Sequence, residues 1–164
     1  MTPEQTEVAL QHYKIAASAM QQNDPVTAIQ QFDACLCINP PAEIAIAAWF
    51  NLATAIVRRY NFPGRLGETI SDEEYKWHEC VMDCFAKVIE TYDDALRSRP
   101  DAAKYQQTYT RAKDNLQRMP VYGLVVVDAK GNPKQRDLEK IRQLARPPIR
   151  CLEKFPPRQS PTGR

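Results

Sequence analysis

Glycine and histidine are scarce in this sequence, and no catalytic motif is present. There are 5 glycines and 2 histidines among 164 residues. The sequence contains no G-x-S-x-G nucleophile motif, no H-E-x-x-H metal motif and no glycine-rich phosphate loop. We therefore expect a protein that is not an enzyme and that needs no cofactor.

Long apolar runs are also missing. The most apolar stretch, residues 44–57, is too short to span a bilayer, and Asn51 interrupts it. The first residues are polar and acidic, unlike a secretory signal peptide. The 5 cysteines are an odd number and lack the spacing of a small disulfide framework, which favours a reducing compartment. We expect a cytoplasmic protein without a transmembrane segment.

The cysteines do not predict a metal site. Cys80 and Cys84 are four residues apart and share one helix face, whereas Cys35 and Cys37 are two apart and point to opposite sides of a helix. His78 is turned away from Cys80. Because a zinc site needs four converging ligands, we expect no metal and interpret the cysteines as small core residues.

The charges are distributed unevenly. Residues 1–120 hold 12 Lys/Arg and 16 Asp/Glu, whereas residues 121–164 hold 10 and 4. A basic extension of this kind suits nucleic acid, an anionic surface or an acidic protein, and it can equally be a solvated tail or lie on the acidic body. It lacks interleaved stacking aromatics, which makes nucleic acid the less expected partner. The candidate tail-binding residues are Lys130, Lys134, Arg136, Lys140, Arg142, Arg146 and Arg150.

Helical spacing of apolar residues dominates the first 120 residues. It predicts helices over residues 3–22, 25–38, 42–60, 71–97 and 101–118, and hence an all-α fold of about five helices. Thr2 and Ser71 begin capping-box patterns, and Asp24 is a natural N-cap before Pro25. Pro120 is expected to close the fifth helix.

The predicted helix at residues 71–97 is unusually long and carries a heptad pattern. The apolar or aromatic positions run without a break from Tyr75 to Leu96 at alternating spacings of three and four. Two interpretations are open. The pattern is the core face of one long helix, which we favour because further apolar residues widen the stripe, or it is a seam that pairs with a second copy.

The last 44 residues differ in character from the rest. Residues 121–127 are rich in β-branched valine and predict one strand, and residues 128–133 predict a turn, but no second strand is evident. This strand either adds to the sheet of a partner or of a second copy, or lies extended over the helical body. From about residue 146 the proline-rich sequence predicts a disordered or extended chain, and disorder is the expectation that we adopt. We accordingly divide the chain into residues 1–120 and a basic extension, 121–164.

Residues 9–40 resemble a tetratricopeptide repeat. Ala16 and Ala28 match the family's small residues, Phe32 its aromatic and Pro40 its closing proline, while His12 replaces another aromatic. A second, stretched repeat begins with a family-like pattern at Trp49, Leu52 and Ala53. It departs from the family through an insertion at residues 61–70 and the overlong helix that follows.

The resemblance implies helix pairs whose first helices line an inner groove, with residues 101–118 as a capping helix. The expected groove residues are Tyr13, Lys14, Ala17, Met20, Phe50, Asn51, Thr54, Val57 and Arg58. The set Gln107, Tyr109 and Arg111 would extend this surface. Some family members hold a terminal carboxylate in this groove, a chemistry that Asn51, Arg58 and Lys14 match.

The resemblance therefore favours a non-catalytic scaffold, adaptor or assembly factor that binds another protein or peptide. Two alternatives stay open. One is nucleic-acid or anionic-surface binding through the basic extension. The other is a structural homo-oligomer, such as a dimer, built on the helix at 71–97 and the strand at 121–127.

Overall fold

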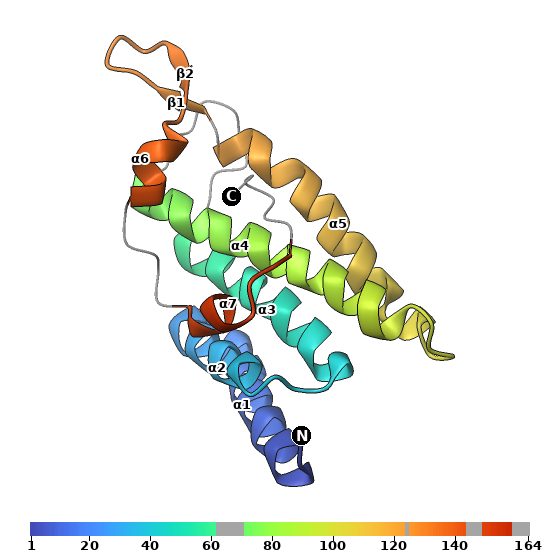
Figure 1. The fold of residues 1–164 in the computed structure, drawn as a ribbon. Coiled ribbons are helices and arrows are strands. Elements are labelled where there is room, and N and C mark those ends of the chain that lie inside the picture. The colour runs from blue at the N-terminus through green and yellow to red at the C-terminus, as the bar shows by residue number, and fades with distance from the viewer. Residues whose placement is uncertain (62–70, 124, 144–148, 159–164) are drawn as a thin grey trace.

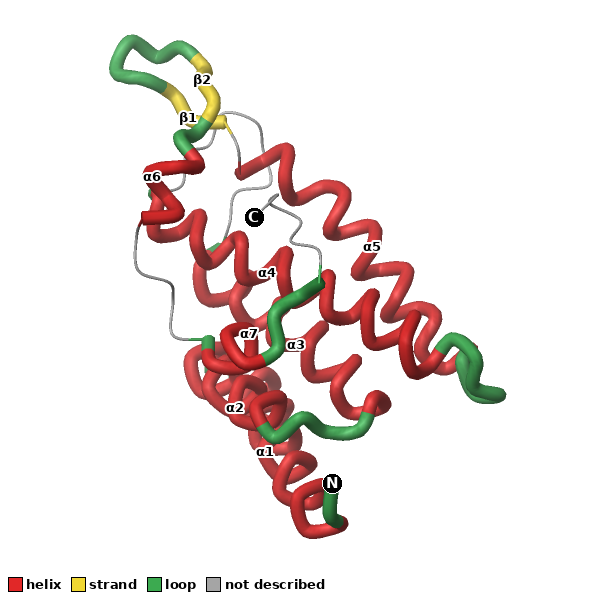
Figure 2. Tube along the Cα trace, in the orientation of Figure 1, coloured by secondary structure: helices red, strands yellow, loops and turns green. Residues whose placement is uncertain are grey.

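Helices make up most of the structure, a computed structural model that describes residues 1–61, 71–123, 125–143 and 149–158. A π-helical turn, η1, extends α4, and two short strands form a hairpin (Figure 1; Figure 2). The prediction of an all-α fold is confirmed. In chain order the elements are α1 (Pro3–Gln21), α2 (Pro25–Cys37), α3 (Ala42–Tyr60), α4 (Asp72–Thr91), η1 (Tyr92–Leu96), α5 (Ala103–Gly123), β1 (Val125–Val127), β2 (Pro133–Gln135), α6 (Leu138–Gln143) and α7 (Arg150–Lys154).

The helix boundaries follow from local capping chemistry. Thr2, Asp24 and Ser71 each accept a hydrogen bond from the backbone N–H three residues later, at 3.1, 3.2 and 3.0 Å. The first and third are complete capping boxes, as predicted. Asparagines with left-handed φ values of 57°, 59° and 46° follow the first three helices: Asn23, Asn39 and Asn61.

Consecutive helices pack on one another from α1 to α5, and α3 also contacts α1 and α5. Phe32 of α2 is fully buried and meets the Tyr13 ring of α1 edge-on, with 5.6 Å between ring centroids. Leu52 and Ile56 of α3 are also fully buried. None of the helices in the described residues is both long and apolar enough to cross a membrane.

Helix α4 lies at the centre of this packing. It contacts α3, α5, α6 and α7 (Figure 1), and the side chains of residues 78–86 are all buried. A helix covered in this way has its heptad positions in the protein core, which is the interpretation that we favoured. Along residues 78–86 α4 leaves no exposed seam on which a second copy could pair.

Two helix ends differ from the predictions. The helix expected over 71–97 ends as an α-helix at Thr91, where η1 inserts a π-turn before Arg97. The helix expected to stop before Pro120 continues to Gly123. Proline costs a helix one backbone hydrogen bond, and here that loss falls in the last turn, where fewer hydrogen bonds depend on it.

Residues 121–127 do not form the single strand that we expected, because residues 121–123 belong to the last turn of α5. Only Val125–Val127 forms β1, and it pairs antiparallel with β2, a second strand that the prediction missed. The Asp128 carboxylate accepts from the backbone N–H groups of Lys130 and Asn132, both at 2.9 Å, and Gly131 has a φ of 82°. Because β2 contains no β-branched residue, apolar alternation could not reveal it.

The disorder expected from about residue 146 is wrong for residues 149–158. This segment contains α7, whose Cys151 and Leu152 are buried, and α7 contacts α2 and α4. Within the described residues no Cα atom of α2 lies within 8 Å of a Cα atom of α4, whereas α7 approaches both helices and so bridges them. The predicted insertion at 61–70 lies, except for Asn61, outside the described residues.

Replacement of Phe32 by alanine should lower the free energy of unfolding by roughly 3–5 kcal/mol, because it removes a fully buried ring and leaves a cavity. Val26→Ala, on the same helix but 48% exposed, is the matched control and should change it by less than about 0.5 kcal/mol. Urea denaturation followed by circular dichroism measures both. Equal losses in the two variants would contradict this assignment of the core.

Candidate functional site

The predicted groove residues lie on α1 and α3, which contact each other, and α3 also contacts α5. The Asn51 side chain of α3 donates a hydrogen bond to the Tyr13 hydroxyl of α1 at 3.0 Å. Burial raises the pKa of the Tyr13 hydroxyl, and the Asn51 hydrogen bond partly offsets this rise. The pair therefore joins the two helices while both side chains remain partly accessible.

A second contact joins the same helices further along. The Arg58 guanidinium donates from Nη1 to the Met20 backbone carbonyl at 3.3 Å. This oxygen belongs to the last turn of α1, where helix carbonyls lack intrahelical partners and a cation is favourable. Lys14 is exposed on α1, and Val57 is 37% exposed beside Arg58 in the sequence.

The third contact links α3 to α5. Phe50 is half-buried and packs on Phe85 of α4, with 5.6 Å between ring centroids. The exposed Arg111 of α5 lies over the Phe50 ring, 5.5 Å from its centroid, in a cation–π contact. Arg111, expected to extend the groove surface, thus lies beside a predicted groove residue.

The remaining predicted groove residues have simpler settings. Ala17 and Thr54 are half-buried, and the Thr54 hydroxyl donates to the Phe50 carbonyl within α3 at 3.2 Å. Gln107 is exposed. The Tyr109 ring stacks on Tyr92, with centroids 4.4 Å apart, and its hydroxyl accepts a hydrogen bond from Arg97 at 2.9 Å.

One of the candidate tail-binding residues, Arg136, is not available at the surface. Arg136 is buried and makes an ion pair with Asp72 of α4 at 2.7 Å, and its guanidinium lies over the Tyr75 ring at 5.0 Å. Lys140 is exposed, 3.9 Å from Asp72. The other described side chains, Lys130, Lys134 and Arg150, are exposed. The side chain of Arg142, and Arg146 as a whole, lie outside the described residues.

The cysteine thiols are poor candidates for chemistry. Cys84 and Cys151 are fully buried, and burial raises the pKa of both thiols. Burial also raises the pKa of Cys35 to about 11. Thiols are nucleophiles and metal ligands as thiolates, so these values disfavour both roles. Among the described residues, no three His, Cys, Asp or Glu side chains gather as a metal ion would require.

Sequence reasoning missed the polar contacts that hold residues 149–158 on the helical body. The Asp33 carboxylate of α2 is 9% exposed and accepts the backbone N–H of Arg150 at 3.2 Å and of Cys151 at 2.8 Å. At the other end of α7, the Lys154 ammonium donates to the Cys37 carbonyl at 2.9 Å. An acidic residue in mid-helix carries no sequence signal for a partner more than a hundred residues away.

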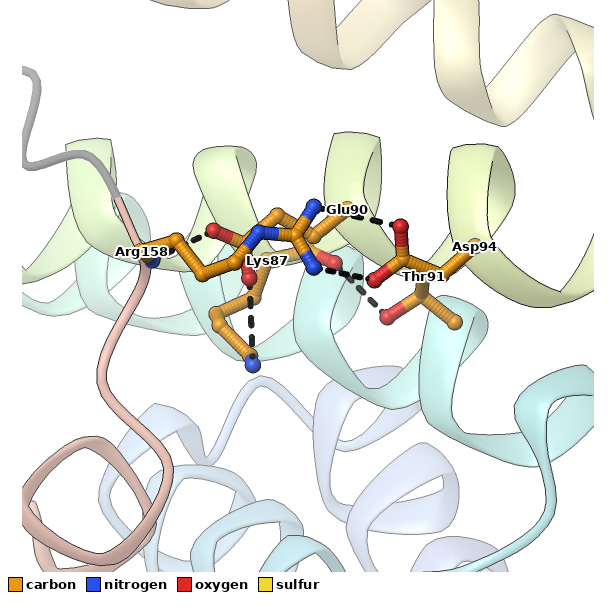
Figure 3. A network of polar contacts seen from close by, with 5 residues as sticks. All are labelled: Lys87, Glu90, Thr91, Asp94 and Arg158. Carbon is orange, nitrogen blue, oxygen red and sulfur yellow. Dashed lines mark hydrogen bonds and ion pairs between the residues drawn. The ribbon is translucent and has the colours of Figure 1, made fainter.

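Arg158 continues these contacts along α4 (Figure 3). Its guanidinium makes a two-pronged ion pair with Asp94, and its backbone N–H donates to Glu90. Glu90 is also paired with Lys87 at 3.3 Å. Because Asp94 and the Arg158 side chain are both more than half exposed, this ion pair positions the segment more than it stabilises the fold.

His78 is a buried polar residue of α4 whose pKa is strongly shifted. His78 is 3% exposed and stacks on Tyr75, with centroids 5.4 Å apart. Burial lowers its pKa to about 4, the Arg136 charge acts in the same direction, and a hydrogen bond with the Met119 backbone opposes both. His78 is therefore neutral at physiological pH and serves the packing between α4 and α5.

Comparison with known proteins identified no family, because no family model, curated protein or solved structure matches this chain.

Stability should fall on acidification because of His78. The unfolded chain binds a proton here near pH 6.5, whereas the folded histidine stays neutral down to about pH 4. The free energy of unfolding therefore carries no penalty from His78 above pH 6.5. As the pH falls from 6.5 to 4, protonation of the unfolded chain lowers this free energy by up to roughly 3 kcal/mol. Denaturation from pH 8 to 4 measures it. His78→Phe should reduce the dependence of the unfolding free energy on pH between 6.5 and 4. The effect of the substitution on packing is measured separately at pH 8. An unchanged pH dependence would contradict the assignment.

Proposed function

We propose that this protein is a non-catalytic scaffold that holds a segment of another protein on the face formed by α1, α3 and α5, in the manner of a tetratricopeptide-like array. The observation that carries the proposal is the set of contacts that crosses this face. Tyr13 with Asn51, Met20 with Arg58, and Phe50 with Arg111 each join two of the three helices. Helices fixed in this way present a rigid surface, which lowers the entropic cost of binding.

The chemistry of the face suits a peptide with acidic character. Lys14, Arg58 and Arg111 are exposed, as is Val57, while Tyr13 and Phe50 are half-buried. Aromatic rings and arginines are the side chains that most often contribute binding energy at interfaces. The set of expected surface residues contains no Asp or Glu, so the cations can raise the association rate of an acidic segment.

The test compares two double charge reversals in the full chain. Lys14→Glu with Arg58→Glu changes the face, and Lys130→Glu with Lys134→Glu makes the same charge change on the hairpin. All four side chains are exposed, so both variants should stay folded. Substitution is preferable to truncation after Pro120, which would cut α5 and remove α7 from α2 and α4.

We use as partner a protein that the wild-type chain captures from cells that make this chain. We expect the affinity for this partner to fall by at least about tenfold in the face variant and to stay unchanged in the hairpin variant. The measurement is quantitative capture with cross-linking, at low and high salt. Loss only in the hairpin variant, with steep salt dependence, would contradict the proposal and favour the basic extension. Sedimentation of the same proteins tests for a homo-oligomer.

A further inference from the structure

Residues 149–158 lie on the helical body as a separate peptide would. This segment contacts both α2 and α4, whose Cα atoms stay more than 8 Å apart in the described part of the chain (Figure 1). We call the area of α2 and α4 under this segment the α2/α4 surface. It is formed by the second helix of each helix pair, whereas the proposed binding face is formed by α1, α3 and α5.

The α2/α4 surface recognises the backbone of the segment. Asp33 accepts from the N–H groups of both Arg150 and Cys151, which a helix of five residues cannot satisfy internally. In the opposite direction, the Lys154 ammonium of the segment donates a hydrogen bond to the Cys37 carbonyl at the end of α2. The two Asp33 contacts fix the position of the first turn of a short helix placed here independently of its side chains, whereas the Cys37 contact requires a cationic side chain such as that of Lys154.

Apolar side chains supply the second part of the recognition. Ile149, Cys151 and Leu152 are 2%, 0% and 4% exposed, so these three side chains are buried against the body. The full burial of Ile149 and Leu152 contributes on the order of 2 kcal/mol each. Arg158 adds its exposed ion pair with Asp94, which helps to set register more than affinity (Figure 3).

A pocket beside the segment leaves room for a larger ligand. It has a volume of about 210 Å³, and Phe155 forms one of its walls. Leu36 of α2, Trp49 of α3 and Lys87 of α4 form others. A segment with a longer apolar side chain near the position of Phe155 could therefore fill space that the chain's own segment leaves open.

Nothing in the segment's own structure holds it in place. An isolated helix of five residues is not stable in water, so α7 exists because the α2/α4 surface orders it. We propose that the α2/α4 surface is a binding site for a short helical peptide, occupied in this structure by the chain's own residues 149–158. The ligand class is a helix that begins after an aliphatic residue, has apolar residues at its second and third positions, and is followed by an aromatic residue and an arginine.

The first experiment releases the segment within the full chain. Leu152→Asp places a charge where a buried leucine packs, and it should detach residues 149–158 while α1 to α5 remain folded. The readout is hydrogen exchange at the Arg150 and Cys151 amides, which should lose protection, compared with the amides of α2 and α4, which should keep it. Glu153→Lys, exposed on the same helix, is the matched control and should leave all protection unchanged.

The second experiment adds the ligand back. An acetylated, fluorescent peptide of residues 149–158 should bind the Leu152→Asp chain at least about tenfold more tightly than wild type, whose own tethered segment competes. Fluorescence anisotropy under thiol reductant measures binding. Adding Asp33→Ala to the released chain should abolish it, since the carboxylate no longer receives the two backbone N–H groups. A peptide carrying Leu152→Asp should not bind either.

Two results would overturn the proposal. If Leu152→Asp unfolds the whole chain, the segment is an inseparable part of the core and not a bound ligand. If the released chain stays folded but does not bind the wild-type peptide, the α2/α4 surface is not a peptide site. Neither result bears on the face formed by α1, α3 and α5, which the charge reversals test separately.

Discussion

The structure depends on the burial of a helix that is rich in polar side chains. Lys76, His78, Glu79 and Asp83 of α4 are all at most 8% exposed, and none of them is without a partner. Buried polar groups are costly unless their hydrogen bonds and charges are satisfied. Cover for α4 must therefore supply partners as well as apolar surface, and this requirement constrains the elements that surround it.

The cover of α4 comes from two parts of the chain. Helix α3 precedes α4 in the sequence and α5 follows it, and both pack on α4 as neighbours in a helical array. The remaining cover is distant in sequence: Arg136 pairs with Asp72, α6 contacts α4, and α7 lies against α4 and α2. These long-range contacts carry a larger entropic cost of closure, which the partly buried Arg136–Asp72 ion pair and the Asp33 hydrogen bonds help to offset. The described part of the extension thus helps to cover a buried helix that carries several charged and polar side chains.

The sequence predicted the features that local chemistry determines. Capping at Thr2, Asp24 and Ser71 needs only neighbouring residues, and the core positions Phe32 and Leu52 follow from helical spacing. Tyr13, Asn51, Met20 and Arg58 could be grouped only through the resemblance to a repeat, and the structure places them in two pairs.

What the sequence concealed depends on distant partners. Residues 149–158 have the proline and basic content of a disordered tail, and only Ile149, Cys151 and Leu152 hint at burial. Their order comes from Asp33, 117 and 118 residues away from the N–H groups that it accepts. The buried state of Arg136 was hidden in the same way, since its charge suggested solvent or nucleic acid and its Asp72 partner lies 64 residues away.

The two surfaces differ in how a partner would have to compete for them. The face of α1, α3 and α5 presents exposed cations, so a partner pays mainly for desolvation and its own ordering. On the α2/α4 surface a partner must also displace a segment tethered to the same molecule, whose effective concentration is on the order of millimolar. If that segment binds its surface with a micromolar intrinsic Kd, the competitor's apparent affinity falls by roughly a thousandfold. Occupation by the chain itself would thus restrict this surface to ligands that bind considerably better than the segment, and the space beside Phe155 is where such a ligand could gain the difference.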